Sequence, residues 1–325
     1  MKFRPIILVA GEPKSVFLEL LFKIYKSNFF KTYKRPIVLV ASKQLILKQM
    51  KILNYKIKIT DIYEKEINRK HLNNKSINLI NIDFEYNYKF NYKTKKYITN
   101  CFKKALSIMS NNSCFALING PISKINFLEK KYLGITEYLS KKTNSKNNEV
   151  MLIYNKNFAV SPITTHQPLN KVSKSIRTNL IVKKIKLINN FYKKYFNKKI
   201  RIAVCGLNPH CETVNKFSEE DKIITPAIKI LKKKKINLKG PLPADTLFLP
   251  QNIKKFDVFV GMYHDQVLTP IKALVGFNAI NITLGLPFLR ISPDHGPNSS
   301  MFGKNKSNPS SLIQCLLFLK KIRGN

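Results

Sequence analysis

The sequence is poor in the features that mark membrane and secreted proteins. No run among its 325 residues approaches the eighteen apolar residues that a membrane-spanning helix requires. The apolar run at 6–10 is too short for a signal peptide and is followed at once by Gly11-Glu12-Pro13. The five cysteines form no Cys-x-x-Cys pair, so free thiols in a reducing compartment fit best. We therefore expect a cytoplasmic protein that does not act on a membrane.

Acidic residues and arginines are both scarce. The chain has 18 Asp and Glu against 58 Lys and Arg, a formal net charge of +40, yet only seven of the cations are arginine. Nucleic-acid surfaces favour arginine, whereas these lysines are scattered with asparagine and isoleucine, as an A/T-biased genome would produce. The charge favours attraction of anionic substrates and cofactors. A nucleic-acid-binding module is the non-enzyme alternative, and it would carry the lysines on one face and bind with strong salt dependence.

The common nucleotide and hydrolase motifs are also missing: there is no Gly-x-Gly-x-x-Gly, no P-loop and no Gly-x-Ser-x-Gly elbow. Short apolar runs instead alternate with amphipathic ones, which is typical of an α/β fold with a mainly parallel sheet. The length suits two domains or one large unit. Residues 62–98 and 141–149 are polar, and we expect surface loops or short hairpins there. The expected strands are 5–10, 36–41, 77–82, 114–118, 150–154, 200–205, 256–261 and 278–284, and the expected helices are 15–27, 43–54, 96–110, 176–197, 219–234, 265–275 and 309–322.

Three histidines are candidates for a common site, and two of them follow expected strands. His210 follows the expected strand 200–205, His264 follows 256–261, and His166 ends the segment SPITTH. Open α/β sheets place ligands at the carboxyl ends of their strands, so the three imidazoles could converge on one divalent metal ion. Their spacing matches no local metal motif, and a lone histidine is more often a hydrogen-bonded structural residue.

The stretch 261–296 concentrates further polar residues between apolar neighbours. Lys272, Asn281 and Arg290 follow His264 on successive elements, and a cation–amide set of this kind suits a phosphorylated or carboxylated anion. Lys272 could equally be a solvated lysine, whereas Arg290 lies among apolar residues in an arginine-poor chain. Asp245, in a proline-rich segment, could make an Asx-turn or move a proton.

Eight short motifs occur in one order along nearly the whole chain, and together they resemble the 4-hydroxythreonine-4-phosphate dehydrogenase family of vitamin B6 biosynthesis. Any one of them is weak evidence, but the ordered set is very specific. The motifs are GEP at 11–13, NGPISK at 119–124, GITE at 134–137, TTH at 164–166, GLNPH at 206–210, LPADT at 242–246, YHDQ at 263–266, and TLGLP at 283–287 continuing to SPDHG at 292–296.

The resemblance implies a two-domain, isocitrate-dehydrogenase-like α/β fold, with an interdomain cleft and a homodimer that shares its active sites. The expected domains are 1–125 plus 280–325 on the cofactor side and 126–279 on the metal, substrate and dimer side. The implied enzyme oxidises 4-phosphooxy-L-threonine with NAD or NADP and releases CO2, giving 3-amino-2-oxopropyl phosphate for pyridoxal 5'-phosphate biosynthesis. It would need one divalent ion per site, Zn, Mg or Co.

The resemblance also assigns roles to individual residues. It implies metal ligation by three histidines, with His264 supplied to the partner's site; substrate binding by four residues; a cofactor-contacting loop; and Asp245 and Lys272 as the candidate catalytic residues. The metal ligands are His166, His210 and His264, the substrate-binding residues are Thr136, Lys272, Asn281 and Arg290, and the cofactor-binding residues are Asp294, His295 and Gly296.

The chain departs from the family pattern near the substrate and cofactor positions. Ile135 stands where the family usually has a histidine, Ser300 stands where it has a carboxylate, and the segment after His210 is shorter. The alternatives are therefore a sister dehydrogenase of another four-carbon acid phosphate, such as threonate or erythronate phosphate, and a catalytically weakened relative. An acyltransferase of the phosphate acetyltransferase type, which needs no metal, is a further rival.

Overall fold

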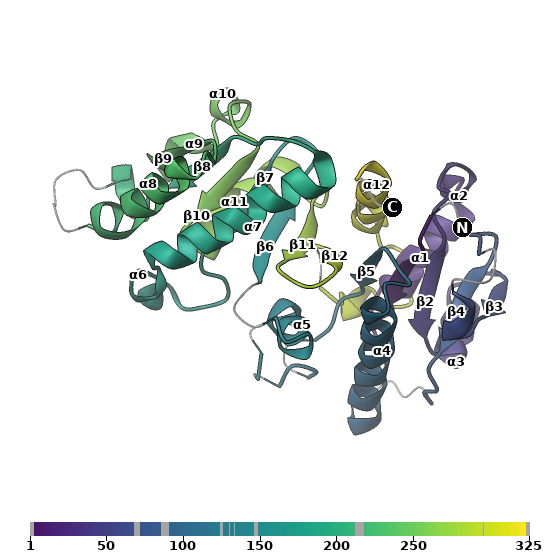
Figure 1. Ribbon diagram of the computed structural model, residues 1–325. Coiled ribbons are helices and arrows are strands. Elements are labelled where there is room, and N and C mark those ends of the chain that lie inside the picture. Colours follow the sequence, from purple (N-terminus) through teal and green to yellow (C-terminus); the bar gives the residue numbers. More distant parts are fainter. Residues whose placement is uncertain are drawn as a thin grey trace. The chain divides into compact units, whose positions relative to one another are not determined.

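The computed structural model describes residues 3–67, 72–85, 91–123, 126–129, 131–132, 134–145, 149–211, 218–294 and 296–322. Contacts divide the chain into two compact units: unit 1 is Met1–Tyr138 with Pro287–Asn325, and unit 2 is Leu139–Leu286. The division falls within helix α5 (Ile135–Lys142). Each unit is an α/β structure (Figure 1).

Unit 1 is built on a parallel sheet with the strand order β3-β4-β2-β1-β5-β12. Most of its strands are buried along their whole length, as expected for a parallel sheet covered on both faces. Its strands are β1 (Ile6–Val9), β2 (Ile37–Ala41), β3 (Ile59–Asp61), β4 (Ile77–Asn81), β5 (Ala116–Asn119) and β12 (Leu289–Pro293), and its helices are α1 (Phe17–Lys26), α2 (Phe29–Thr32), α3 (Lys43–Ile52), α4 (Tyr92–Ser110) and α12 (Ser310–Lys321), with single 3-10 turns at Glu64–Glu66 and Ser299–Met301.

Unit 2 has the strand order β11-β6-β7-β10-β8-β9. Strands β7, β10, β8 and β9 run parallel, whereas β6 pairs antiparallel with both β11 and β7. Its strands are β6 (Val150–Tyr154), β7 (Ala159–Pro162), β8 (Ile202–Cys205), β9 (Leu238–Leu242), β10 (Val258–Gly261) and β11 (Ile280–Leu284), and its helices are α6 (Val172–Ser175), α7 (Thr178–Phe196), α8 (Thr225–Lys233), α9 (Ala244–Leu247), α10 (Pro250–Ile253) and α11 (His264–Val275), with 3-10 turns at Leu169–Lys171 and Pro209–Cys211 and a π-helical turn at Glu220–Ile224.

The α/β class with a mainly parallel sheet is confirmed, and each expected strand and helix is present within a few residues. The expectation for 219–234 was wrong in one respect, because a π-helical turn precedes α8 there. The loop expected over 62–98 was also partly wrong, since α4 already begins at Tyr92, where the Asn91 side chain caps Thr94 N. Residues 280–286, expected in the first domain, lie in unit 2 because β11 pairs with β6.

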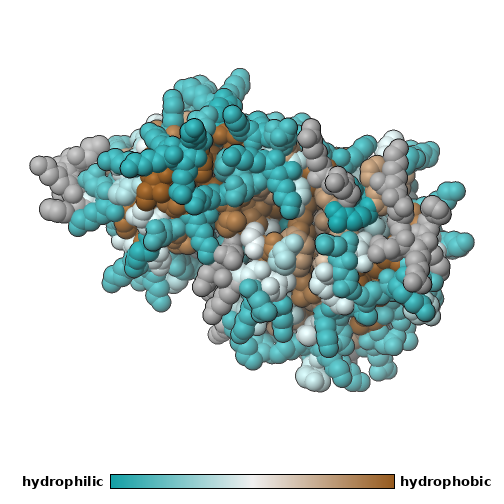
Figure 2. Space-filling view, viewed as in Figure 1, coloured by the Kyte–Doolittle hydropathy of each residue, from teal (hydrophilic) through white to brown (hydrophobic). Residues whose placement is uncertain are grey.

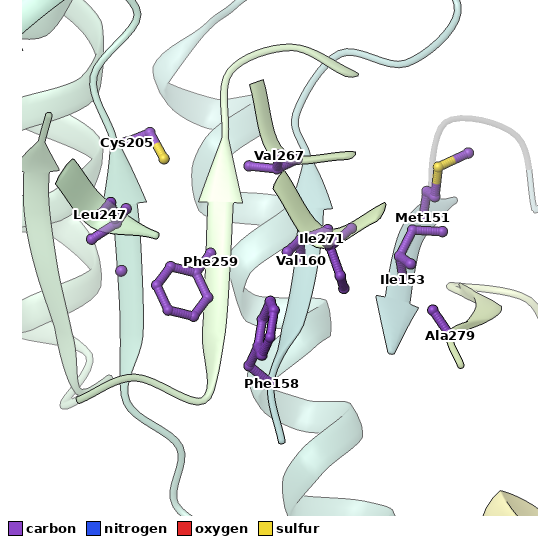
Figure 3. Close-up of a cluster of buried hydrophobic side chains, with 11 residues drawn as sticks. Met151, Ile153, Phe158, Val160, Cys205, Leu247, Phe259, Val267, Ile271 and Ala279 are labelled. Atoms are coloured by element: carbon purple, nitrogen blue, oxygen red, sulfur yellow. The ribbon is translucent and has the colours of Figure 1, made fainter. Parts of the chain in front are cut away.

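A cluster of buried apolar side chains in unit 2 joins β7, β8 and β10 to α11. Phe259 of β10 lies between Phe158 and Phe248, with ring centroids 5.6 and 5.0 Å away. Val267 and Ile271 of α11 belong to the same cluster (Figure 3). Burying an aromatic or aliphatic side chain of this size contributes about 1.5–3 kcal/mol. The core therefore holds α11, which begins at His264, against β10.

Hydrophilic side chains cover most of the face shown in Figure 2, as the lysine content leads one to expect. Within the described ranges, no helix is long and apolar enough to cross a membrane. All five cysteines are free thiols, as expected, and four of them are buried.

Candidate metal and substrate site

Four neighbouring parallel strands of unit 2 bring the candidate metal ligands to one sheet edge. The order β7-β10-β8-β9 places all four carboxyl ends side by side. His166 follows β7, His264 follows β10, His210 follows β8 and Asp245 follows β9. The third histidine therefore also lies beyond a strand end, which the sequence did not predict because β7 was not recognised. This edge is where open α/β sheets bind ligands.

The four side chains form two pairs, each on adjacent strands. The rings of His166 and His264 have centroids 5.5 Å apart. His210 Nε2 lies 3.9 Å from Asp245 Oδ2, with both side chains well exposed. Neighbouring strands are about 4.8 Å apart, so side chains on adjacent strand ends meet, whereas those of β7 and β8 start about 10 Å apart.

Two of the three expected ligands are spaced for a shared ion. Imidazole nitrogens bind zinc at about 2.0–2.1 Å, which places two ring centroids on one ion roughly 5 Å apart. His264 Nδ1 lies 2.6 Å from Asp265 Oδ1, an arrangement that orients the ring and leaves Nε2 for a ligand. The donor chemistry therefore fits a divalent metal, although in the described part of one chain no group of three His, Cys, Asp or Glu is arranged to hold it.

The His210 segment has an unusual backbone. His210 and Cys211 both adopt left-handed φ values, +53° and +65°. A non-glycine residue in this region costs free energy and persists only where surrounding contacts enforce it. Burial also raises the pKa of the Cys211 thiol. The strained turn projects the His210 side chain outward, with 84% of it exposed.

The candidate substrate residues of unit 2 lie on α11 and β11. Lys272 is half-buried and eight residues beyond His264, so it stands about 12 Å along the α11 axis. Asn281 is opposite Ile153 in the β11–β6 ladder. Its Oδ1 is buried and makes no hydrogen bond to the described protein atoms. A buried acceptor without a hydrogen bond costs free energy. A ligand that donates a hydrogen bond to this oxygen would recover that free energy.

The other two substrate candidates belong to unit 1. Arg290 of β12 is fully buried and donates from Nε to Asn119 Oδ1 over 2.8 Å. Burial lowers the pKa of its guanidinium to about 10, although the nearby Cys315 and Glu137 oppose the shift. Thr136 of α5 is 5% exposed. Both side chains are thus held inside the unit, and their contact with substrate stays a prediction.

The candidate cofactor segment begins where β12 ends. The backbone N–H of Asp294 donates to Ser311 Oγ over 3.0 Å. Gly296 is exposed, and a side chain added there would meet no atom within 4 Å, so a ligand could approach its backbone closely. His295, the third predicted residue, lies outside the described residues.

A half-buried acidic group near this segment escaped the sequence analysis. Glu12 accepts a hydrogen bond from Ser123 N over 2.6 Å, which ties the GEP and NGPISK motifs together at the ends of β1 and β5. Burial raises the pKa of its carboxyl group. Gly120 allows this close packing, because a Cβ there would lie 2.3 Å from Ala10 O. The motif GEP was the available signal, since a carboxylate directly after a buried strand is placed at the ligand edge.

A hollow of about 680 Å³ lies elsewhere in unit 1, where β2, β3 and β4 begin, and so does not belong to the candidate site. Its lining includes six of the chain's many lysines, Lys26, Lys31, Lys34, Lys56, Lys58 and Lys75.

Comparison with known proteins agrees with the motif resemblance. Residues 32–318 match the family described as pyridoxal phosphate biosynthetic protein PdxA. The chain is 37% identical over 332 residues to 4-hydroxythreonine-4-phosphate dehydrogenase of Sulfurihydrogenibium sp., covering 97% of this chain and 98% of the relative. The crystal structure of the Klebsiella pneumoniae enzyme of that name has a TM-score of 0.84 at 25% identity, with 98% of both chains covered.

A more distant likeness bears on the fold alone. Isocitrate dehydrogenase from Methylococcus capsulatus has a TM-score of 0.50 at 9% identity, covering 98% of this chain and 85% of that one. The predicted isocitrate-dehydrogenase-like fold is thereby confirmed. Because the family match spans most of the sequence and the relative is similar along its whole length, the chain belongs to the pyridoxal phosphate biosynthetic protein PdxA family.

Proposed function

We propose that this chain oxidises and decarboxylates 4-phosphooxy-L-threonine in a metal- and NAD-dependent reaction that yields 3-amino-2-oxopropyl phosphate, CO2 and NADH. The family match carries the proposal, and the three histidines at neighbouring strand ends of unit 2 support it. The product would feed pyridoxal 5'-phosphate biosynthesis.

Two bound groups would supply chemistry that side chains cannot. A divalent ion would act as a Lewis acid on the reacting oxygen, and NAD or NADP would accept the hydride. His166, His210 and His264 would hold the ion, which we propose to be Zn, Mg or Co. The segment at Asp294 and Gly296 would contact the cofactor.

The remaining residues would bind the substrate and move protons. Oxidation converts the hydroxyl β to the carboxylate into a ketone, and the resulting β-keto acid then loses CO2. The proton released from the hydroxyl is balanced by the one taken up when CO2 leaves. Asp245, whose Oδ2 lies 3.9 Å from His210 Nε2, would exchange that proton. Lys272 and Arg290 would hold anionic groups, while Asn281 and Thr136 would orient the substrate.

We also propose that the chain acts as a homodimer in which His264 serves the partner's site. The family match supports this proposal, and within one chain His166 and His264 form one pair while His210 lies beside Asp245. Analytical ultracentrifugation would test the oligomeric state. Mixing His210→Ala and His264→Ala chains would test sharing, because shared sites predict partial recovery of activity in mixed dimers.

The reaction is tested by following NADH absorbance with 4-phosphooxy-L-threonine, with and without a chelator. We expect metal-dependent NADH formation that His210→Ala abolishes. Gln251→Ala, at an exposed position of α10 in the same unit, serves as the control and should keep full activity. Activity that survives both chelation and His210→Ala would refute the proposed mechanism.

A sister activity is the second candidate, because Ile135 stands directly before the buried Thr136 where the family usually has a histidine. An isoleucine can neither hydrogen-bond nor carry charge, so one substrate contact would differ. The same assay with threonate and erythronate phosphates decides between the two. A higher kcat/KM for either one would replace the first substrate, and no turnover of any of the three would indicate a weakened relative.

A further inference from the structure

A chain of hydrogen bonds links the backbones of all three histidine-bearing segments of unit 2. On one side, Thr164 donates to Met262 O from its backbone N over 3.1 Å and from Oγ1 over 2.7 Å. Ile163 N also donates to Gly261 O over 2.8 Å. The segment leading to His166 is therefore fixed against the segment leading to His264.

The link to the third segment is made by a single side chain. Gln266, two residues after His264, accepts from Met262 N at Oε1 over 2.7 Å and donates from Nε2 to Gly206 O over 2.8 Å. Met262 lies beyond β10 and Gly206 lies beyond β8. One amide thus uses its acceptor on its own segment and its donor on the segment that carries His210.

The far side of the His210 segment is held by a buried carboxylate. Glu220, 2% exposed, accepts from Leu207 N over 2.7 Å and from Asn208 N over 2.9 Å. The segment after Gly206 therefore has contacts on both sides, with Gln266 toward His264 and Glu220 toward the π-helical turn.

Glycines make the two side-chain contacts possible. A Cβ at Gly261 would lie 3.0 Å from Gln266 Oε1 and 2.5 Å from Val267 Cγ1, and one at Gly206 would lie 3.0 Å from Glu220 Oε1. Larger residues would push the amide and the carboxylate away from the backbone. The close approach is thus built into both strand ends.

We infer that Gln266 is a positioning residue, which fixes the His210 and His264 segments of one chain against each other, sets how both histidines are presented to the metal ions of the dimer, and thereby sets the affinity for metal. This inference rests on the proposed metal site. An amide is required, because a side chain of the same size with two acceptors, or with none, cannot bridge Met262 N and Gly206 O at once.

The test titrates the full-length, metal-free protein with Co(II) and follows both affinity and the visible absorption bands that report ligand geometry. Gln266→Met removes both hydrogen bonds at similar volume, and Gln266→Glu keeps the acceptor for Met262 N but loses the donor to Gly206 O. We expect both variants to bind Co(II) about 10–100-fold more weakly and with altered bands. Gln251→Met should match the wild type.

A second readout needs no metal. Hydrogen exchange of the amides at Leu207 and Asn208 should accelerate in both Gln266 variants and not in the control. If the residue only stabilised the fold, Co(II) affinity would follow the stability of each variant, and the Glu variant, which keeps one bond, would bind like the wild type. That result, or unchanged affinity in both variants, would overturn the inference. Wild-type protein that binds no Co(II) would instead refute the proposed metal site.

Discussion

The buried carboxylate of Glu220 allows a quantitative test of how the His210 segment is held. It accepts three hydrogen bonds, from Leu207 N, Asn208 N and Asn208 Nδ2, over 2.7, 2.9 and 2.9 Å. A hydrogen bond to a charged group contributes about 1.5–3 kcal/mol. Because Leu207 and Asn208 are only half-buried, water recovers part of that loss when the carboxylate is removed. We therefore expect Glu220→Ala to lower the free energy of unfolding by about 3–5 kcal/mol.

Glu220→Gln should cost less, about 1–2 kcal/mol, because its amide oxygen can still accept from both backbone N–H groups. Urea unfolding followed by far-ultraviolet circular dichroism gives both values. Asp221→Ala changes an exposed carboxylate in the same turn and should cost less than about 0.5 kcal/mol. If Glu220→Ala costs no more than Asp221→Ala, or the amides of Leu207 and Asn208 keep their exchange protection, the His210 segment is not held in this way.

Three further predictions concern unit 1. Arg290→Leu removes the donor to Asn119 Oδ1 and should lower the free energy of unfolding in urea by about 1–3 kcal/mol; a smaller cost with a raised KM would favour a substrate-binding role. Burial raises the pKa of Glu12, so the native carboxyl keeps its proton at pH values above 4.5 where the unfolded chain has lost it. Stability should therefore fall as pH rises through that window, and the slope should be missing in Glu12→Gln. Gly120→Ala, whose Cβ would lie 2.3 Å from Ala10 O, should lower the free energy of unfolding by at least about 1–3 kcal/mol, whereas Gly296→Ala should be tolerated. Equal melting temperatures of the two variants would contradict this.

Apolar runs located the central strands because a strand buried on both faces needs little beyond Val, Ile and Leu. The strands that were missed depart from that composition. β9 contains Gly240 and Pro241, β7 ends at Pro162, and β12 carries the fully buried Arg290. Each is stabilised by its neighbours in the sheet, so its own residues give a weak signal.

The start of the last helix was predicted to within one residue. The helix expected over 309–322 begins at Ser310, where Asn308 Oδ1 accepts from Ser310 N over 2.9 Å. The segment expected to be a helix over 219–234 begins with a π-helical turn. The sequence did not predict this turn, because amino-acid composition does not distinguish it from an α-helix. The turn carries Glu220, so the sequence analysis missed a residue that positions the site.

The spacing of the candidate ligands depends on strand order, which no local pattern contains. His166 and His264 are the most distant pair in sequence, yet their rings are in contact, because β10 is inserted between β7 and β8. That insertion separates the His166 and His210 segments by one strand. A side chain just beyond β10 can therefore reach the segments that follow β7 and β8. Gln266 donates to Gly206 O in the segment that carries His210, while Met262 O, in the segment of Gln266, accepts from Thr164 Oγ1. The sequence could identify the candidate ligands, but the strand order that places β10 between β7 and β8 determines which of them meet. The same strand order explains why an amide side chain follows His264.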